Sequence, residues 1–240
     1  RNTILKACDV VITDCYFLKN LLVSFDVQES KIMVVHNSVE YLPKPNDFNK
    51  EQFKRENNLK EKVILTVCRL VPWKGVGTVM KLLPDLKNDF PDISFVSIGD
   101  GPEFAKLKNE GEKIKNQSGL DIRFLGNLPR RDVVPWYLSA DAYVLNTNYE
   151  GIAHTLVEAL YFRAPVVTTN AGGNPEIIIN EYNGLVVDYD NRVHLLQGIK
   201  RVLSNNDLVQ NFKANSQEKL KGDFLWEKVV ETHLQALKIT

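Results

Sequence analysis

The sequence predicts an α/β protein whose sheet is parallel, doubly wound and Rossmann-like. Short β-branched runs, at 63–67, 93–98 and 166–169, alternate with longer stretches of helical periodicity. This alternation is typical of a parallel sheet that helices cover on both faces. Glycine-rich turns follow several of the runs. Because such sheets bind ligands at the carboxyl ends of their strands, these turns are the expected ligand-binding positions.

The first part of the chain contains two β-branched strands and one helix. They are expected at 9–13, at 31–36 and, between them, at 16–25. Pro43 and Pro45 then mark a linker. We therefore divide the chain into a first unit, 1–40, and a second unit, 41–240. The chain begins at Arg1, within a helical pattern, so we expect an upstream portion to be missing.

The second unit repeats strand and helix. Its expected strands are 63–67, 93–98, 122–125, 141–146, 166–169 and 184–187. Its expected helices are 75–88, 103–115, 131–139 and 154–162, with further helices over most of 191–238. The last of these, over 224–237, carries an apolar stripe at helical spacing, which indicates core packing.

Composition excludes several classes of protein. The 240 residues contain 30 basic and 30 acidic side chains, so a nucleic-acid partner is not expected. No run reaches the length of about 20 apolar residues that a transmembrane helix needs. Cys8, Cys15 and Cys68 are odd in number and lack metal-ligand spacing. They fit a reducing compartment, so we expect a cytoplasmic protein, either free or peripheral to the membrane.

The stretch 149–160 is the strongest candidate for a binding site. Glu150 ends a strand, and Gly151 lets a ligand approach the backbone closely. The helix that follows begins with free amide groups, which favour a phosphate. These amides belong to Ile152, Ala153, His154 and Thr155. Glu158 lies one helical turn further on, so two carboxylates and several amides would face one crevice, as a nucleotide sugar requires.

Two other interpretations of this stretch remain open. Thr155 and Glu158 have the spacing of a capping box, which would make Glu158 structural. His154 could donate to the phosphate or to the donor sugar, or it could be a structural histidine.

The loop 68–75 also follows a buried strand and precedes a helix. It carries Arg69, which offers a fork of donors, and Lys74, which offers a point charge. Positive charge at a diphosphate stabilises the negative charge that develops as this group leaves. The alternative is that both side chains are solvated in a surface loop.

These motifs together resemble those of one family. Glu150 and Glu158 match the E-x7-E signature of the retaining GT-B glycosyltransferases of family 4, or glycosyl transferases group 1. The loop from Cys68 to Gly75 resembles the G-R-L-x-x-x-K-G motif of that family, with cysteine at the first glycine. Ser38 and Glu40 replace two residues of its N-G-V-D turn.

The resemblance implies that the chain is the C-terminal, donor-binding half of a GT-B fold. The first unit would be the remnant of an N-terminal acceptor-side domain, onto which the terminal helix crosses back. A hexose-like unit would pass with retention from a nucleoside-diphosphate sugar to an acceptor that is a sugar, a lipid-linked sugar or a small molecule. No cofactor and no metal are expected.

The resemblance also implies roles for individual residues. Arg69 and Lys74 would bind the diphosphate, Glu150 the donor sugar and Glu158 the ribose. The first three are therefore the expected catalytic residues. Gly101, in a G-x-G-P turn, and Leu128, in a segment whose backbone contacts the nucleobase, would complete the donor site.

Three alternatives accompany this interpretation. The chain could be a nucleotide-sugar-binding module without catalysis, or a nucleotide-sugar epimerase of the same architecture. Asp188, Tyr189 and Asp190 mimic a D-x-D metal motif, but they lack its strand and loop context. We expect Asp190 to be a helix N-cap or a turn residue instead.

Overall fold

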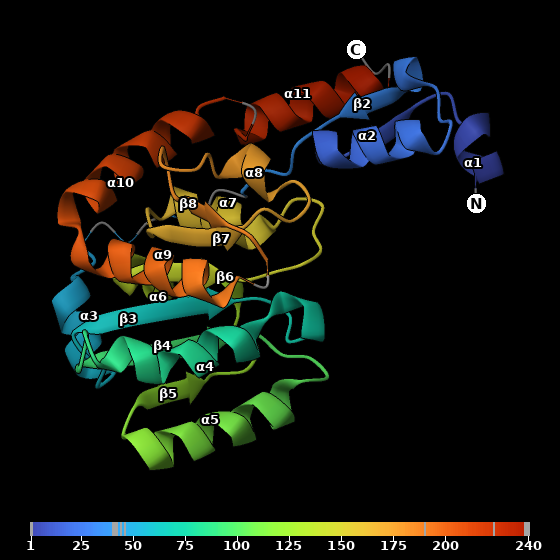
Figure 1. Cartoon of the computed structure of the whole chain (residues 1–240). Coiled ribbons are helices and arrows are strands. Elements are labelled where there is room, and N and C mark those ends of the chain that lie inside the picture. Colours follow the sequence, from blue (N-terminus) through green and yellow to red (C-terminus); the bar gives the residue numbers. More distant parts are fainter. Residues whose placement is uncertain are drawn as a thin grey trace.

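The structure, a computed structural model, describes residues 2–39, 43, 45, 47–189, 191–222 and 224–237. Its main feature is a six-stranded parallel sheet, which confirms the predicted fold class (Figure 1). The strands are β3 (Lys62–Val67), β4 (Ile93–Ile98), β5 (Asp121–Phe124), β6 (Ala142–Leu145), β7 (Val166–Thr169) and β8 (Leu185–Val187). They lie in the order β5-β4-β3-β6-β7-β8.

Helices cover both faces of this sheet, as the apolar strands predicted. One face carries α4 (Val76–Lys87), α5 (Phe104–Ser118) and α9 (Arg192–Ser204). The other carries α6 (Arg130–Ser139) and α7 (His154–Tyr161), backed by α3 (Lys50–Glu56) and α10 (Asn206–Leu220). The sequence did not predict α3, because its seven residues include a single apolar side chain, Phe53, and so show no periodicity.

The strand order reverses between β3 and β6. From β3 the chain adds β4 and β5 on one side, and from β6 it adds β7 and β8 on the other. The central pair is in register with Ile64 opposite Ala142 and Leu65 opposite Tyr143. In a doubly wound sheet this reversal opens a crevice at the carboxyl ends of the two strands. The loops that start at Cys68 and Asn146 therefore meet there.

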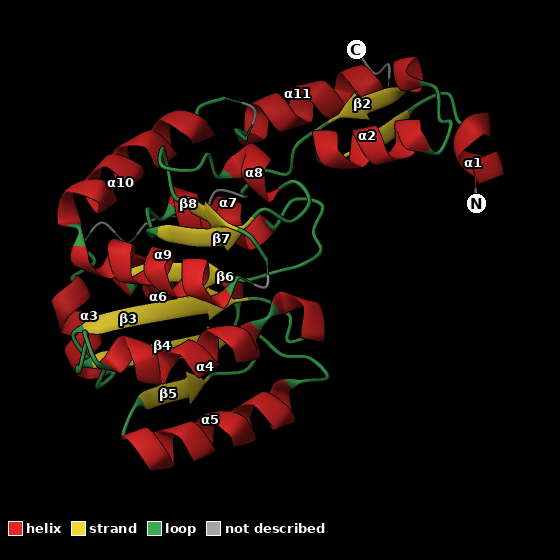
Figure 2. Cartoon of the chain, in the orientation of Figure 1, coloured by secondary structure: helices red, strands yellow, loops and turns green. Residues whose placement is uncertain are grey.

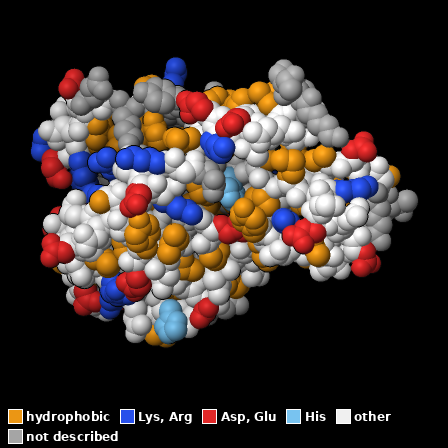
Figure 3. Space-filling model, turned by 90° about the horizontal axis from the view of Figure 1, so that it is seen from above, with side chains coloured by type: hydrophobic (Ala, Val, Ile, Leu, Met, Phe, Trp, Pro, Cys, Tyr) orange, Lys and Arg blue, Asp and Glu red, His pale blue; other side chains and the backbone are white. Residues whose placement is uncertain are grey.

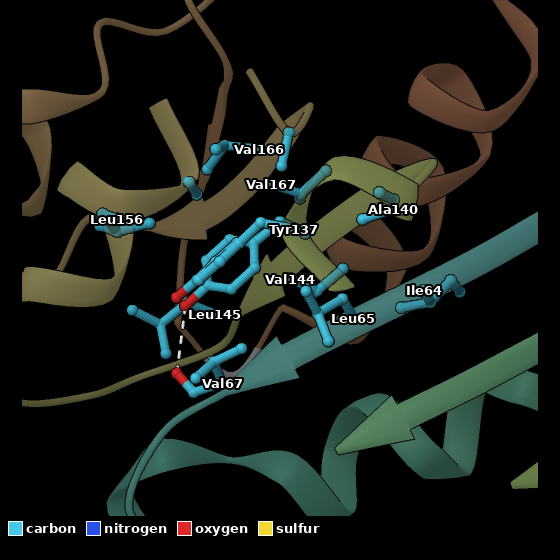
Figure 4. Packing of buried hydrophobic residues seen from close by; sticks show 14 of the residues in the cluster. Ile64, Leu65, Val67, Tyr137, Ala140, Val144, Leu145, Leu156, Val166 and Val167 are labelled. Carbon is cyan, nitrogen blue, oxygen red and sulfur yellow. Dashed lines mark hydrogen bonds between the residues drawn. The ribbon is translucent and has the colours of Figure 1, made fainter. Parts of the chain in front are cut away.

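Two buried tyrosines hold this part of the core together. Figure 4 shows the ring of Tyr137, from α6, among aliphatic side chains that include Val144 and Leu145. The neighbouring Tyr143 donates a hydrogen bond of 3.2 Å to the carbonyl of Val67, at the end of β3. Burial raises the pKa of both phenols well above the ordinary value. Both are therefore neutral hydrogen-bond donors.

The first residues form a separate, smaller sheet. Its elements are α1 (Asn2–Ala7), β1 (Val11–Thr13), α2 (Tyr16–Ser24), the 3-10 turn η1 (Glu29–Lys31) and β2 (Ile32–Val34). The strands β1 and β2 pair in parallel. Figure 2 shows the last helix, α11 (Trp226–Ala236), running beside this sheet. The His36 ring stacks on Phe224 at 4.9 Å, so the end of the chain returns to its beginning.

Further contacts join the first unit to the second. The Glu176 carboxylate accepts hydrogen bonds of 2.9 and 2.8 Å from the amides of Tyr16 and Phe17, at the start of α2. Seen from above, the molecule carries hydrophobic side chains among charged ones (Figure 3). The division at residue 40 stays a prediction, because Glu40 and much of the linker lie outside the described residues.

No helix in the part of the chain that the structure describes is long and apolar enough to cross a bilayer.

Candidate functional site

A cavity of about 470 Å³ lies at the carboxyl ends of β3 and β4. The predicted site residues that line it are Arg69, Leu128, Thr155 and Glu158. Cys68 and Arg130 line it as well. The structure therefore brings together residues from four separate loops and helices, at the edge of the sheet where the topology predicts a ligand.

Arg69 is the free cation of this cavity. Its side chain is exposed and makes no hydrogen bond or ion pair with another described residue. The loop that carries it is nevertheless fixed, because the amide of Leu70 donates 2.9 Å to the carbonyl of Asp100. Gly101 does not line the cavity and instead packs against the Leu70 carbonyl. Its role is thus to support the Arg69 loop.

Lys74 and Glu150 bond to each other beside the cavity. The Lys74 Nζ donates to Glu150 Oε1, and the two side chains are only 15% and 11% exposed. The loops behind them are joined by the amide of Asn148, which donates 2.8 Å to the carbonyl of Trp73. Burial raises the pKa of the Cys68 thiol to about 12, while the Lys74 charge lowers it and the Glu150 charge raises it. Lys74 and Glu150 do not line the cavity themselves, whereas Cys68 does.

Glu158 is held by two side chains from α6. Its Oε1 accepts 2.9 Å from Arg130 Nε, and its Oε2 accepts 2.9 Å from the Tyr137 hydroxyl. The capping-box interpretation was wrong, because the N-cap of α7 is Ala153 and not Thr155, and the Glu158 carboxylate bonds to Arg130 and Tyr137. Glu158 is instead a fixed carboxylate with one edge on the cavity.

Arg130 and Tyr137 were not predicted. The available signal for Arg130 was its place at the start of a helix, directly after a glycine-containing turn that ends a strand. Tyr137 gave no signal, because a tyrosine on an amphipathic helix is most often a core residue.

The start of α7 is partly occupied by the first unit. The Ile152 amide donates 3.2 Å to Asp14 Oδ2, whereas the amides of Ala153, His154 and Thr155 have no hydrogen-bond acceptor among the described residues. The His154 side chain is exposed. Three of the four predicted amides are therefore free for an anion.

Gly151 allows Asp14 to come this close. A Cβ on Gly151 would lie 2.7 Å from Asp14 Oδ2, so any other residue there would displace the Asp14 carboxylate. Gly172, at φ +56°, packs in the same way on the Glu150 carbonyl, which a Cβ would approach to 1.9 Å. The turn that carries Glu150 therefore packs closely on Asp14 at Gly151 and on Gly172 at the Glu150 carbonyl. These contacts join distant segments, so the sequence of the turn does not indicate them.

Among the described residues, no group of three or more histidine, cysteine or acidic side chains could hold a metal ion. Asp188 accepts 2.8 Å from Asn170 Nδ2. The N-cap of α9 is Asn191, whose side chain accepts 3.0 Å from the His194 amide, so of the two roles expected for Asp190 the N-cap was wrong and the turn stays a prediction. Asp190 itself lies outside the described residues.

The parallel sheet and the cavity at its strand reversal define a doubly wound, Rossmann-like domain, and sequence comparison identifies its family. The model of the family described as "Glycosyl transferases group 1" matches residues 47–219. The chain belongs to this family.

Relatives cover most of the chain. An uncharacterized glycosyltransferase of Methanocaldococcus jannaschii is 25% identical over 96% of the chain, and spore coat protein SA of Bacillus subtilis is 26% identical over 95%. The chain spans 58% and 64% of the lengths of these two proteins.

Solved structures share the fold. HepE of Anabaena in complex with UDP-glucose superposes with a TM-score of 0.83 at 19% identity, over 98% of this chain and 65% of that one. A glycosyltransferase of Rickettsia africae superposes with a TM-score of 0.84 at 22% identity, over 100% of this chain and 67% of that one. The predicted match to the GT-B architecture is thereby confirmed.

Proposed function

We propose that this chain is the donor-binding part of a retaining glycosyltransferase of family 4, which transfers a hexose-like unit from a nucleoside-diphosphate sugar. One observation carries the proposal: the cavity at the reversal of strand order joins the free Arg69, the fixed Glu158 and the start of α7, with the Lys74–Glu150 pair beside it. The structure of HepE with UDP-glucose supports a donor of this type.

The nucleoside would occupy the cavity itself. Glu158 has the geometry to accept from ribose hydroxyls, because Arg130 and Tyr137 hold its carboxylate in one orientation. Leu128 lies on the wall, where the backbone would contact the base. Arg69 and the amides of Ala153, His154 and Thr155 would then surround the diphosphate with positive charge.

The Lys74–Glu150 pair would exchange partners when the donor binds. Lys74 would turn to the diphosphate and stabilise the charge that develops as it leaves. Glu150 would accept from a hydroxyl of the donor sugar. Each charge thus keeps a partner in the empty and in the occupied site, which avoids the cost of a buried unpaired charge. The acceptor would approach from the side of the first unit and of an N-terminal domain, in the cytoplasm or at the membrane surface.

Calorimetry with UDP, GDP and ADP tests the proposal. We expect one of them to bind with a dissociation constant below about 1 mM, the upper end of ordinary substrate constants. A transfer assay with the matching sugar nucleotide then separates an enzyme from a binding module, and incubation of the donor alone detects an epimerase. If a folded protein bound none of the three nucleotides, the proposal would be wrong.

Asp14 should oppose the binding of the donor. Its Oδ2 accepts a hydrogen bond from the Ile152 amide, and its Oδ1 is buried without a hydrogen-bond partner among the described residues. Asp14→Asn keeps the shape and an acceptor oxygen for Ile152 but removes a negative charge beside the proposed phosphate position. We expect affinity for the nucleoside diphosphate to rise by about threefold to tenfold, as for a partly screened charge pair. Calorimetry at low and high salt measures this, and Asp26→Asn, on the surface of the same unit, is the control. An affinity that fell would show that Asp14 contributes to binding.

Tyr137→Phe tests how Glu158 is held. The variant keeps the buried ring and removes the hydroxyl that donates to Glu158 Oε2. We expect binding of the nucleoside to weaken by about 0.5–1.5 kcal/mol, the usual value of one hydrogen bond. The control is Tyr182→Phe, which removes an exposed hydroxyl bonded to Glu218. Unchanged nucleoside affinity in Tyr137→Phe would mean that Arg130 alone positions the carboxylate.

A further inference from the structure

A second polar cavity lies at the opposite edge of the main sheet. It has a volume of about 280 Å³ and is bounded by Lys62, the first residue of β3, by Asp141, directly before β6, and by Pro165, directly before β7. Lys50 of α3 and Lys213 of α10 complete its charged lining. These positions are at the amino ends of the strands, so this cavity is separate from the one that binds the proposed donor.

The carboxylate of this cavity is already saturated. Asp141 Oδ1 accepts 2.7 Å from Lys50, and Oδ2 accepts 2.8 Å from Lys54 and 2.8 Å from the Val63 amide. Burial acts to raise the pKa of Asp141, but the two lysines outweigh it and lower that pKa. Asp141 therefore stays ionised, and it has little capacity left for a third cation.

Lys213 lines the cavity without an ion-pair partner in the described part of the chain. Its side chain is half-buried, and its ammonium makes no hydrogen bond or ion pair with another described residue. Burial lowers its pKa, and the charges of Lys50 and Arg163 lower it further, against the attraction of Asp141. Among the residues that the structure describes, Lys62 forms an ion pair only with Glu61, at 3.3 Å, and Glu61 is largely exposed. Positive charge therefore exceeds negative charge in a concave, partly desolvated place.

We propose that this cavity binds a phosphate-bearing anion between Lys213, Lys50 and Lys62. Lysine ammonium groups recognise phosphate as point charges, and a multiply charged anion would give Lys213 the partner that the protein does not supply. The volume is several times the 30 Å³ or so that a water molecule takes in the liquid, so a phosphate or a diphosphate has room. The site would act independently of the donor cavity.

Inorganic pyrophosphate is the probe, and calorimetry and backbone amide NMR measure its binding. Because pyrophosphate would also enter the donor cavity, the titration is made in an Arg69→Ala background, and the NMR shifts show which cavity fills. We expect shifts at residues 204–209, which adjoin the second cavity. Adding Lys213→Gln should weaken this binding by about tenfold or more, as for the loss of a hydrogen bond to a charged group. Lys213→Arg should keep most of it, and Lys113→Gln, an exposed lysine on α5, should change it little.

The same chemistry could come from a free anion or from a lipid headgroup. Vesicles of phosphatidylglycerol, compared with vesicles of phosphatidylcholine, separate the two sources. If the protein sediments with the anionic vesicles and the Lys213→Gln variant does not, the ligand is a lipid headgroup. If pyrophosphate binds but the protein does not sediment with the vesicles, the ligand is a free anion. If pyrophosphate shifted only residues of the donor cavity, or if Lys213→Gln and Lys113→Gln bound it equally, the proposal would be overturned. Neither result would affect the proposed transferase function.

Discussion

Replacing Lys74 with alanine should lower the rate of sugar transfer by about 10²–10³-fold, as expected when one preorganised group that stabilises developing charge is lost. Lys74 is held beside the cavity by Glu150, so it can turn to a diphosphate without a large movement of the backbone. Its removal should also weaken binding of the nucleoside diphosphate more than binding of the nucleoside, because its proposed partner is the phosphate. Steady-state kinetics and calorimetry with UDP and uridine, or with the matching base, measure both effects.

The control for this variant is Lys81→Ala, which removes an exposed lysine from α4 in the same part of the fold. Glu150 is left without its cation in Lys74→Ala, so the melting temperature should be followed as well. The double variant Lys74→Ala with Glu150→Gln removes both charges and should recover any lost stability but not the rate. Equal losses of nucleoside and diphosphate affinity would contradict a phosphate role for Lys74.

Glu158→Ala should weaken binding of the nucleoside and of its diphosphate alike, by about 1–3 kcal/mol, because a buried hydroxyl would lose its acceptor. It should also lower the melting temperature, since Tyr137, which is 1% exposed, would keep a hydroxyl without its partner. Calorimetry and thermal unfolding measure these two effects separately.

Two further variants make this result specific. Glu158→Gln keeps the shape and one acceptor oxygen, so its loss of affinity should be smaller than that of alanine. Glu112→Ala removes an exposed glutamate from α5 and should leave binding unchanged. A Glu158→Ala protein that melted earlier but bound the nucleotide as well as before would show that this carboxylate only supports α6.

Much of the fold could be predicted from local patterns. The strands at 93–98 and 166–169 were predicted to the residue, because each is a short run of apolar and β-branched residues with turn-forming residues on both sides. The helix α3 was missed because its stability comes from packing on α6, where the Phe53 ring meets Trp136 at 5.2 Å, and not from a periodic sequence.

Some residues of the candidate site could likewise be predicted from local sequence, and others depend on tertiary contacts. Arg69 and Glu158 could be chosen from motifs, and both line one cavity. Asp14 could not be chosen, because it lies 138 positions from the Ile152 amide that it contacts. Arg130 is a partial case: its place after a glycine-containing turn was a signal, but its bond to Glu158 depends on how α6 and α7 are placed in the fold.

The sequence by itself determined the alternation of strands and helices, the edge of the sheet where the cavity lies and several of the side chains that line it. It could do so because the spacing of apolar residues and the composition of turns are local properties. Only the tertiary structure decided that Lys74 pairs with Glu150, that Tyr137 and Arg130 hold Glu158 and that Asp14 accepts from the Ile152 amide before α7. It also decided that Lys213 lines a second cavity without an ion-pair partner among the described residues. These facts depend on distances between segments far apart in the chain. Such distances are set by how the helices pack on the sheet, and no short window of sequence contains them.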